Sequence, residues 1–167
     1  MSDTGSTLEL LIPDAAAMEQ LGKHLAAALT PGKLFLTGEL GMGKTTLVRG
    51  FLRAKGYQGP VKSPTYTLIE PYCLEGLDIY HFDLYRIDSP DALEALGARD
   101  YFGPSSVCLV EWADRAAAYL SIADLSIHIE QGADQRKVTL LARSPAGQDG
   151  IARAHSAQSK CRMIKQL

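Results

Sequence analysis

Apolar and polar positions along the chain recur with two different periods, and this predicts alternating strands and helices. Behind Asp14, a residue suited to cap a helix, apolar side chains recur at helical spacing over 18–29. The consecutive apolar residues at 107–110 are typical of a strand that is buried on both faces. We therefore predict an α/β fold in three layers, with helices on both faces of a sheet.

The other predicted elements follow from shorter stretches of the same patterns. In chain order they are strands at 7–12 and 33–37, a helix ending near Lys55, a loop over 56–61, strands at 65–70 and 79–86 connected through 71–78, a short helix between Ser89 and Gly97, and strands near 125–129 and 138–140. Ser89 is placed to cap the short helix, with Pro90 at its first position. The last two strands flank a turn at Gly132, so we expect an antiparallel hairpin at one end of the sheet.

Composition places the chain in a broad class. It has 167 residues, a formal net charge of −2 and a hydrophobic content of 46%, which fits one domain with a real core. This charge does not mark the whole chain as a nucleic-acid binder. No apolar run approaches the length of a membrane span, and the three cysteines form no Cys-x-x-Cys pair. We expect a cytoplasmic protein with reduced cysteines and no membrane association.

The C-terminal end differs from the rest. After position 151 the charged residues are all basic: Arg153, Lys160, Arg162 and Lys165. Little apolar bulk accompanies them. We therefore divide the chain into a domain at 1–147 and a basic, loosely ordered tail at 148–167.

Residues 38–45, Gly-Glu-Leu-Gly-Met-Gly-Lys-Thr, match the phosphate-binding loop of nucleotide-binding proteins between a predicted strand and a predicted helix. Glycines allow backbone N–H groups to turn towards a polyphosphate at the positive end of the helix. Lys44 is expected to reach the phosphates and Thr45 to ligate Mg²⁺. The predicted nucleotide contacts of this loop are Glu39, Leu40, Gly41, Met42, Gly43, Lys44, Thr45 and Thr46. The alternative is a glycine-rich turn that only caps a helix.

Two acids are candidates to complete a site around the loop. Glu111 ends the apolar strand, where an acid can face Mg²⁺ directly or through water, although many strands end in an acid for no such reason. In the strand at 79–86, His81 and Asp83 share one face. Asp83 is suited to orient or deprotonate an attacking water, whereas His81 is equally consistent with a structural role.

Two further segments lie near these acids in the sequence. Ser63-Pro64-Thr65-Tyr66 supplies hydroxyls on a rigid turn that is able to sense a γ-phosphate as a switch segment does; without further context, a plain turn is the simpler interpretation. Trp112 is a candidate to line the site or contact a partner, although a single tryptophan is more often core filling.

Taken together, four segments resemble the TsaE family, formerly called YjeE. They are 38–50, Ser63-Pro64-Thr65-Tyr66, His81-Phe82-Asp83-Leu84-Tyr85-Arg86 and Leu109-Val110-Glu111-Trp112, in the family's order. These are bacterial P-loop ATPases needed to make threonylcarbamoyladenosine in tRNA, and the resemblance spans about 8–141. It implies a P-loop NTPase fold and an ATP hydrolase that binds the TsaD and TsaB proteins and drives their turnover.

The resemblance also implies roles for single residues. Lys44 would bind phosphate, Thr45 and Glu111 would hold Mg²⁺, and Asp83 would be the acid important for hydrolysis. Thr65 and Trp112 would lie near the nucleotide and the partner-facing switch. On this basis the catalytic residues are predicted to be Lys44, Asp83 and Glu111.

Other functions stay open at this point. A small-molecule P-loop kinase would need a lid that carries several arginines, and the arginines here are scattered. A nucleotide-gated assembly module without significant catalysis would use the same residues as the ATPase. GTP is disfavoured as the fuel because the chain contains no asparagine, and so no Asn-Lys-x-Asp motif. The basic tail has two interpretations, solvated disorder or a contact with tRNA phosphates.

Overall fold

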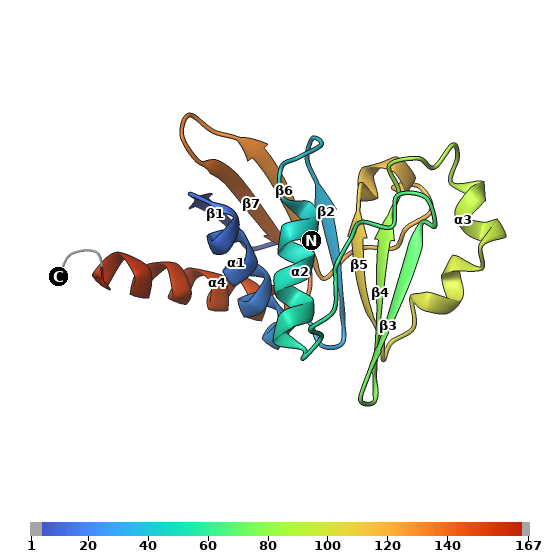
Figure 1. Cartoon of the computed structure of the whole chain (residues 1–167), viewed down its shortest axis with the longest axis horizontal. Helices are drawn as coiled ribbons and strands as arrows, with labels where there is room; N and C mark the ends of the chain where they lie inside the picture. The colour runs from blue at the N-terminus through green and yellow to red at the C-terminus, as the bar shows by residue number, and fades with distance from the viewer. Residues whose placement is uncertain (1–4, 165–167) are drawn as a thin grey trace.

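The computed structural model describes residues 5–164 and places a seven-stranded sheet between helices (Figure 1). In chain order the elements are β1 (Thr7–Ile12), α1 (Ala15–Ala28), β2 (Gly32–Thr37), α2 (Lys44–Ala54), β3 (Ile69–Leu74), β4 (Leu77–Asp83), α3 (Asp91–Ala95), a 3₁₀ helix (Ala98–Tyr101), β5 (Val107–Glu111), a second 3₁₀ helix (Ala113–Ala116), β6 (Leu125–Gln131), β7 (Arg136–Ala142) and α4 (Pro145–Ile164). The strand order across the sheet is β1-β7-β6-β2-β5-β4-β3.

The centre of the sheet is parallel and both ends are antiparallel. Strand β2 pairs in parallel with β5 and with β6, and β4 pairs in parallel with β5. The predicted hairpin is formed by β6 and β7, and β1 adds to its outer side as a further antiparallel strand. A second hairpin, β3 with β4, ends the sheet on the opposite side.

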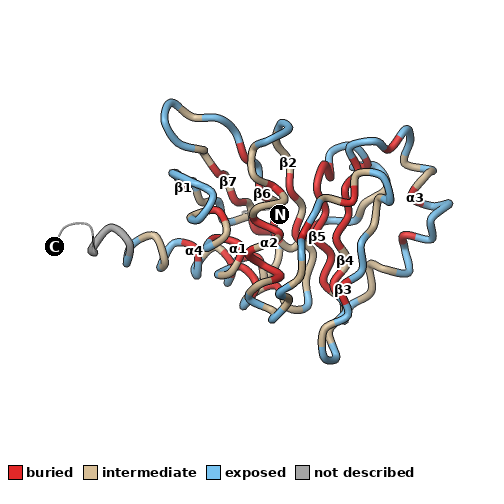
Figure 2. The backbone as a smooth tube through the Cα atoms, in the orientation of Figure 1, coloured by how far each residue is buried: buried red, intermediate tan, exposed pale blue. Residues whose placement is uncertain are grey.

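Alternate residues of the central strands pack into two hydrophobic cores, one on each face of the sheet. Leu34 and Leu36 of β2 pack in the core that α1, α2 and α4 cover, whereas Phe35 packs against the core under α3 and the 3₁₀ helices. Strand β5 is buried along its whole length for this reason, and β4 is buried towards its carboxyl end (Figure 2). Helices therefore cover both faces, and the predicted three-layer α/β fold is confirmed.

Helices α1 and α2 cross at unusually short range because each carries a glycine at the contact. A Cβ on Gly22 would lie 2.1 Å from the carbonyl oxygen of Leu47, and a Cβ on Gly50 would lie 2.0 Å from that of Glu19. An ion pair between Arg49 and Glu19, 3.6 Å apart, flanks the crossing. The close approach brings the first turn of α1, capped as predicted by Asp14, beside the start of α2.

Three local predictions were wrong. Strand β4 spans Leu77–Asp83 rather than 79–86. Strand β3 begins at Ile69 rather than at 65 and continues through Pro71, which had been assigned to a connection. Proline is tolerated there because β3 is an edge strand and needs fewer backbone donors. Ser89 does not cap α3 with its side chain, and the helix begins at Asp91, with Pro90 as its capping residue.

The C-terminal segment forms a helix instead of the expected loosely ordered tail. Helix α4 begins at Pro145 behind Ser144, whose hydroxyl accepts a hydrogen bond from the Gly147 N–H at 3.2 Å. Ile151 and Ala154 pack on the core beside α1. Proline at the first position and many strong helix formers outweigh the charge pattern. Beyond these contacts the helix extends away from the body (Figure 1), and positions 165–167 of the expected tail lie outside the described residues.

Candidate functional site

Three parallel strands deliver polar side chains to one edge of the sheet. Strand β2 ends at Thr37, next to the glycine-rich loop, while β5 ends at Glu111 and β4 at Asp83. Glu111 pairs in register with Asp83 on one side and with Leu36 on the other. Because carboxyl ends of parallel strands meet at this edge, it is where an α/β sheet binds ligands.

The loop between β2 and α2 has the backbone conformation that the motif requires. Gly38, Gly41 and Gly43 all have positive φ angles, of 139°, 79° and 110°. A Cβ on Gly38 would also lie 2.3 Å from the carbonyl oxygen of Ile129. At the start of α2 no side chain of the described residues caps the helix, so its first N–H groups are left for an anion.

Lys44 lies almost fully buried inside this loop. Its Nζ donates to the carbonyl oxygens of Gly38 at 2.5 Å and Glu39 at 2.9 Å, and lies 4.2 Å from the centre of the Trp112 ring. Burial lowers the pKa of the Lys44 ammonium, while four nearby carboxylates, first among them that of Glu111, act in the opposite direction. The ammonium is thus held on the concave side of the loop, ready for phosphate oxygens.

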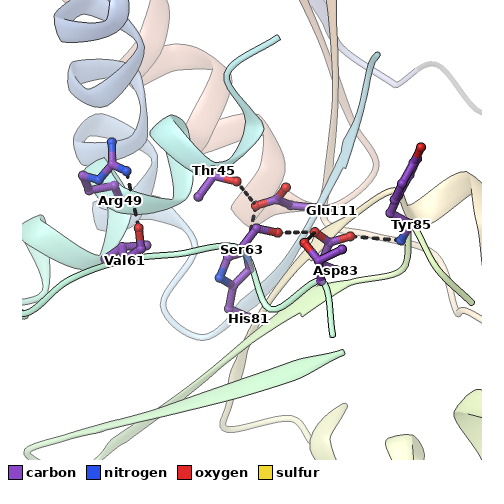
Figure 3. A network of polar contacts seen from close by, with 9 residues as sticks. Thr45, Arg49, Val61, Ser63, His81, Asp83, Tyr85 and Glu111 are labelled. Atoms are coloured by element: carbon purple, nitrogen blue, oxygen red, sulfur yellow. Dashed lines mark hydrogen bonds and ion pairs between the residues drawn. The ribbon is translucent and has the colours of Figure 1, made fainter. Parts of the chain in front are cut away.

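The Glu111 side chain contacts both the start of α2, at Thr45, and strand β4, at His81. Its Oε1 accepts a hydrogen bond from the Thr45 hydroxyl at 2.9 Å and lies 2.8 Å from Nε2 of His81 (Figure 3). The two predicted magnesium ligands are therefore in direct contact. Hydroxyl and carboxylate oxygens are ligands that Mg²⁺ prefers, so this donor set fits the ion.

Asp83 lies beside this pair and is held by the segment Ser63-Pro64-Thr65-Tyr66, for which a turn and a switch were both considered. Its Oδ2 accepts hydrogen bonds from the hydroxyls of Ser63 and, at 3.2 Å, Thr65. Its Oδ1 accepts from the Tyr85 backbone N–H at 2.9 Å (Figure 3). His81 and Asp83 therefore point to the same side of β4, as their spacing predicted.

Trp112 follows Glu111 in an unusual backbone conformation. Its φ is 56°, in the left-handed region that bulky residues rarely adopt. The ring is buried, lies against Lys44 and packs on the ring of Tyr85 at 4.9 Å between centres. Backbone strain of this kind, about 1–3 kcal/mol, persists where surrounding contacts hold it and is common at functional sites.

A cavity of about 400 Å³ opens at this edge, and most of the predicted site residues line it. The predicted residues that line it are Leu40, Gly41, Met42, Gly43, Lys44, Thr45, Thr46, Thr65, Asp83, Glu111 and Trp112. Glu39 does not line the cavity, and its carbonyl oxygen accepts a hydrogen bond from Lys44 Nζ. Among the described residues no group of three or more histidine, cysteine or acidic side chains is arranged to hold a metal.

Sequence reasoning missed one side of this cavity. Asp14 and Met18 from the start of α1 line it, as does Arg136 from the start of β7. A Cβ on Gly43 would lie 3.4 Å from both Arg136 Nη1 and Met18 Cε, which shows how closely they approach the loop. No local motif connects these residues to the loop, because they reach it only through the α1–α2 crossing and the β6–β7 hairpin.

Comparison with known proteins places this geometry in a family. The family model described as "Threonylcarbamoyl adenosine biosynthesis protein TsaE" matches residues 12–138. The chain belongs to the TsaE family. A protein of Haemophilus influenzae called "tRNA threonylcarbamoyladenosine biosynthesis protein TsaE" is 43% identical to it, over 87% of this chain and 96% of the relative. A protein of Bacillus subtilis with the same name is 42% identical, over 73% of this chain and 77% of the relative.

A solved structure supports the same conclusion. The crystal structure of Bacillus subtilis YdiB has a TM-score of 0.75 and 30% identity, and the match covers 93% of this chain and 98% of that one. As a TsaE family member, the protein has a role in the biosynthesis of threonylcarbamoyladenosine in tRNA. Every residue that lines the cavity falls inside the matched segment 12–138, and α4 falls outside it. Among the described helices, none combines the length and the apolar character needed to cross a membrane.

Proposed function

We propose that the protein is a Mg²⁺-dependent ATPase of the cytoplasm that binds the TsaD and TsaB proteins and supports their modification of tRNA. The observation that carries this proposal is the convergence of the phosphate loop, Lys44 and two acids on one cavity. In other P-loop proteins each of these parts has a partner on the nucleotide: backbone N–H groups and lysine on the phosphates, hydroxyl and acid on Mg²⁺. Membership of the TsaE family supports the pathway.

Each residue has a distinct proposed task. The N–H groups at the start of α2 and the Lys44 ammonium bind the phosphates and stabilise the charge that develops on them. Thr45 and Glu111 hold Mg²⁺, which neutralises phosphate charge when bound. Asp83 orients the attacking water, and to do so it exchanges its hydrogen bonds from Ser63 and Thr65 for one to that water. The Ser63–Thr65 segment is thereby coupled to the nucleotide.

Phosphate release from ATP tests the proposal. Turnover is measured for the protein alone and with purified TsaD and TsaB, each with and without Mg²⁺. We expect slow Mg²⁺-dependent turnover alone and faster turnover with the partners. Tight ATP binding without turnover in any mixture would instead indicate a nucleotide-gated assembly module. Transfer of the phosphate to a small molecule would indicate a kinase.

A further inference from the structure

His81 makes a buried contact to which the proposed reaction assigns no role. The imidazole has no exposed surface, and its Nε2 lies 2.8 Å from Oε1 of Glu111. A carboxylate only accepts hydrogen bonds, so the tautomer that makes this bond carries its proton on Nε2. The other ring nitrogen, Nδ1, is buried and has no hydrogen-bond partner among the described residues.

An unpaired buried nitrogen argues against a purely structural histidine. On the same strand the neighbouring positions are filled by apolar side chains, such as Phe82, which leave no polar atom unpaired. An apolar residue at position 81 would fill the interior without the penalty of burying Nδ1. Unlike an apolar residue, a histidine at position 81 contacts Glu111.

Two side chains contact Oε1 of Glu111, and only one of them is not a proposed ligand of Mg²⁺. The hydroxyl of Thr45 also bonds Oε1, at 2.9 Å, but Thr45 is itself a proposed ligand of Mg²⁺. His81 does not line the cavity. Both hydrogen bonds of the Glu111 carboxylate involve Oε1, which leaves Oε2 for the ion or its water.

We propose that His81 is a positioning residue whose Nε2–H fixes Oε1 of Glu111 and so keeps the carboxylate oriented towards Mg²⁺. The inference rests on the proposed function, because it assumes that Glu111 serves the ion. Partners that orient a metal-binding carboxylate contribute strongly to metal affinity, and their loss typically weakens it by roughly 10–100-fold. His81 therefore sets how much Mg²⁺ strengthens nucleotide binding, and not how well the nucleotide binds without it.

Binding of a fluorescent ADP analogue, titrated with and without Mg²⁺, tests this on full-length variants. His81→Leu removes the donor, and we expect it to reduce the gain in affinity due to Mg²⁺ by roughly 10–100-fold while the Kd without Mg²⁺ stays as in the wild type. His81→Gln is able to place an amide N–H near the position of Nε2 and should restore most of the gain. His24→Leu, at an exposed histidine of α1, is the matched control and should change neither value.

Further variants keep the test decisive. Should His81→Leu not fold, His81→Asn replaces it, because its shorter amide reaches the position of Nδ1 and leaves Oε1 without that donor. In a Glu111→Gln background, loss of the His81 donor should have no additional effect on the Mg²⁺ gain, because the group it acts through is already changed. The proposal is overturned if the donor-free variant keeps the full gain, if its Mg²⁺-free binding falls equally, or if glutamine restores nothing. Absence of ATP turnover in the wild type would remove the proposed function and leave this binding result unaffected.

Discussion

Replacing Lys44 by alanine is the most direct test of the site. The Nζ lies in the concave side of the loop, where a phosphate oxygen about 4 Å away would interact with it by about 4 kcal/mol at an effective dielectric constant of about 20. Mutational loss of one preorganised donor costs about 2.7–4 kcal/mol of transition-state stabilisation, or about 10²–10³ in rate. The two magnitudes agree, so we expect turnover of Lys44→Ala to fall by about 10²–10³.

Stability should change much less than turnover. Lys44→Ala removes two hydrogen bonds to loop carbonyls, worth about 1 kcal/mol each, but it also removes the cost of burying an ammonium, whose pKa burial already lowers. A net change of about 1 kcal/mol corresponds to a shift of about 2–4 °C in the Tm of a domain of this size.

The assay combines steady-state phosphate release with a thermal melt. Lys160→Ala is the matched control, because it removes an exposed lysine of α4 far from the cavity and should leave turnover and Tm unchanged. A folded Lys44→Ala protein that hydrolyses ATP at nearly the wild-type rate would refute the assignment of the site.

The remaining predictions follow from other parts of the molecule. Asp83→Asn should retain nucleotide binding and lose about 10²–10⁴ in turnover; loss of ATP binding instead would mean that the roles of the two acids are reversed. Glu111→Ala and Thr45→Ala should each raise the Mg²⁺ concentration needed for half-maximal activity, and an unchanged requirement in both would argue against a shared ion. Burial raises the pKa of Tyr72 to about 12, so its contribution to stability is present below pH about 10 and is lost as the pH rises towards 12; urea unfolding of Tyr72→Phe should show a shallower loss over that window. Deleting 159–167 removes three basic residues but none of the α4 contacts with the core, so ATPase activity should persist; if the helix end contacts tRNA on the partner complex, the log-affinity against log-salt slope should flatten by up to about 2–3, whereas an identical slope would exclude that contact.

Elements with a local signal were predictable from the sequence. The turn at the glycine-rich loop, the capped start of α1 at Asp14 and the apolar run of β5 all depend on neighbouring residues, and the structure confirms the backbone of each. Predictions failed where the deciding contact was remote. Whether Pro71 belongs to a strand depends on β3 lying at the edge of the sheet, and edge position is a property of the whole topology.

The C-terminal helix shows a different kind of error. Its start at Ser144-Pro145 is a local signal that was present in the sequence but was outweighed by the charge pattern that follows. The packing of Ala154 against the core beside α1 was not predictable, because alanine carries no strong apolar signal and its burial depends on how closely α4 approaches.

Site residues were predicted where their spacing in the sequence places them together. They were missed where only the topology of the sheet brings them together. Period-two spacing put His81 and Asp83 on one face, and both indeed reach the same polar network. No spacing connects Arg136 to the phosphate loop, from which it is separated by most of the chain. It arrives there because β7 belongs to a hairpin whose partner β6 lies beside β2.

The distribution of buried polar groups gives an independent argument for the location of the site. Among the described residues the buried charged or polar side chains are Lys44, His81, Asp83 and Glu111. All four lie at the carboxyl edge of the parallel strands, and elsewhere the two cores are apolar. Burying such groups opposes folding unless they are paired, and even paired groups are often no more stabilising than apolar residues of similar volume. Packing alone would favour apolar residues at all four positions, so their concentration at one edge supports the proposed location of the site.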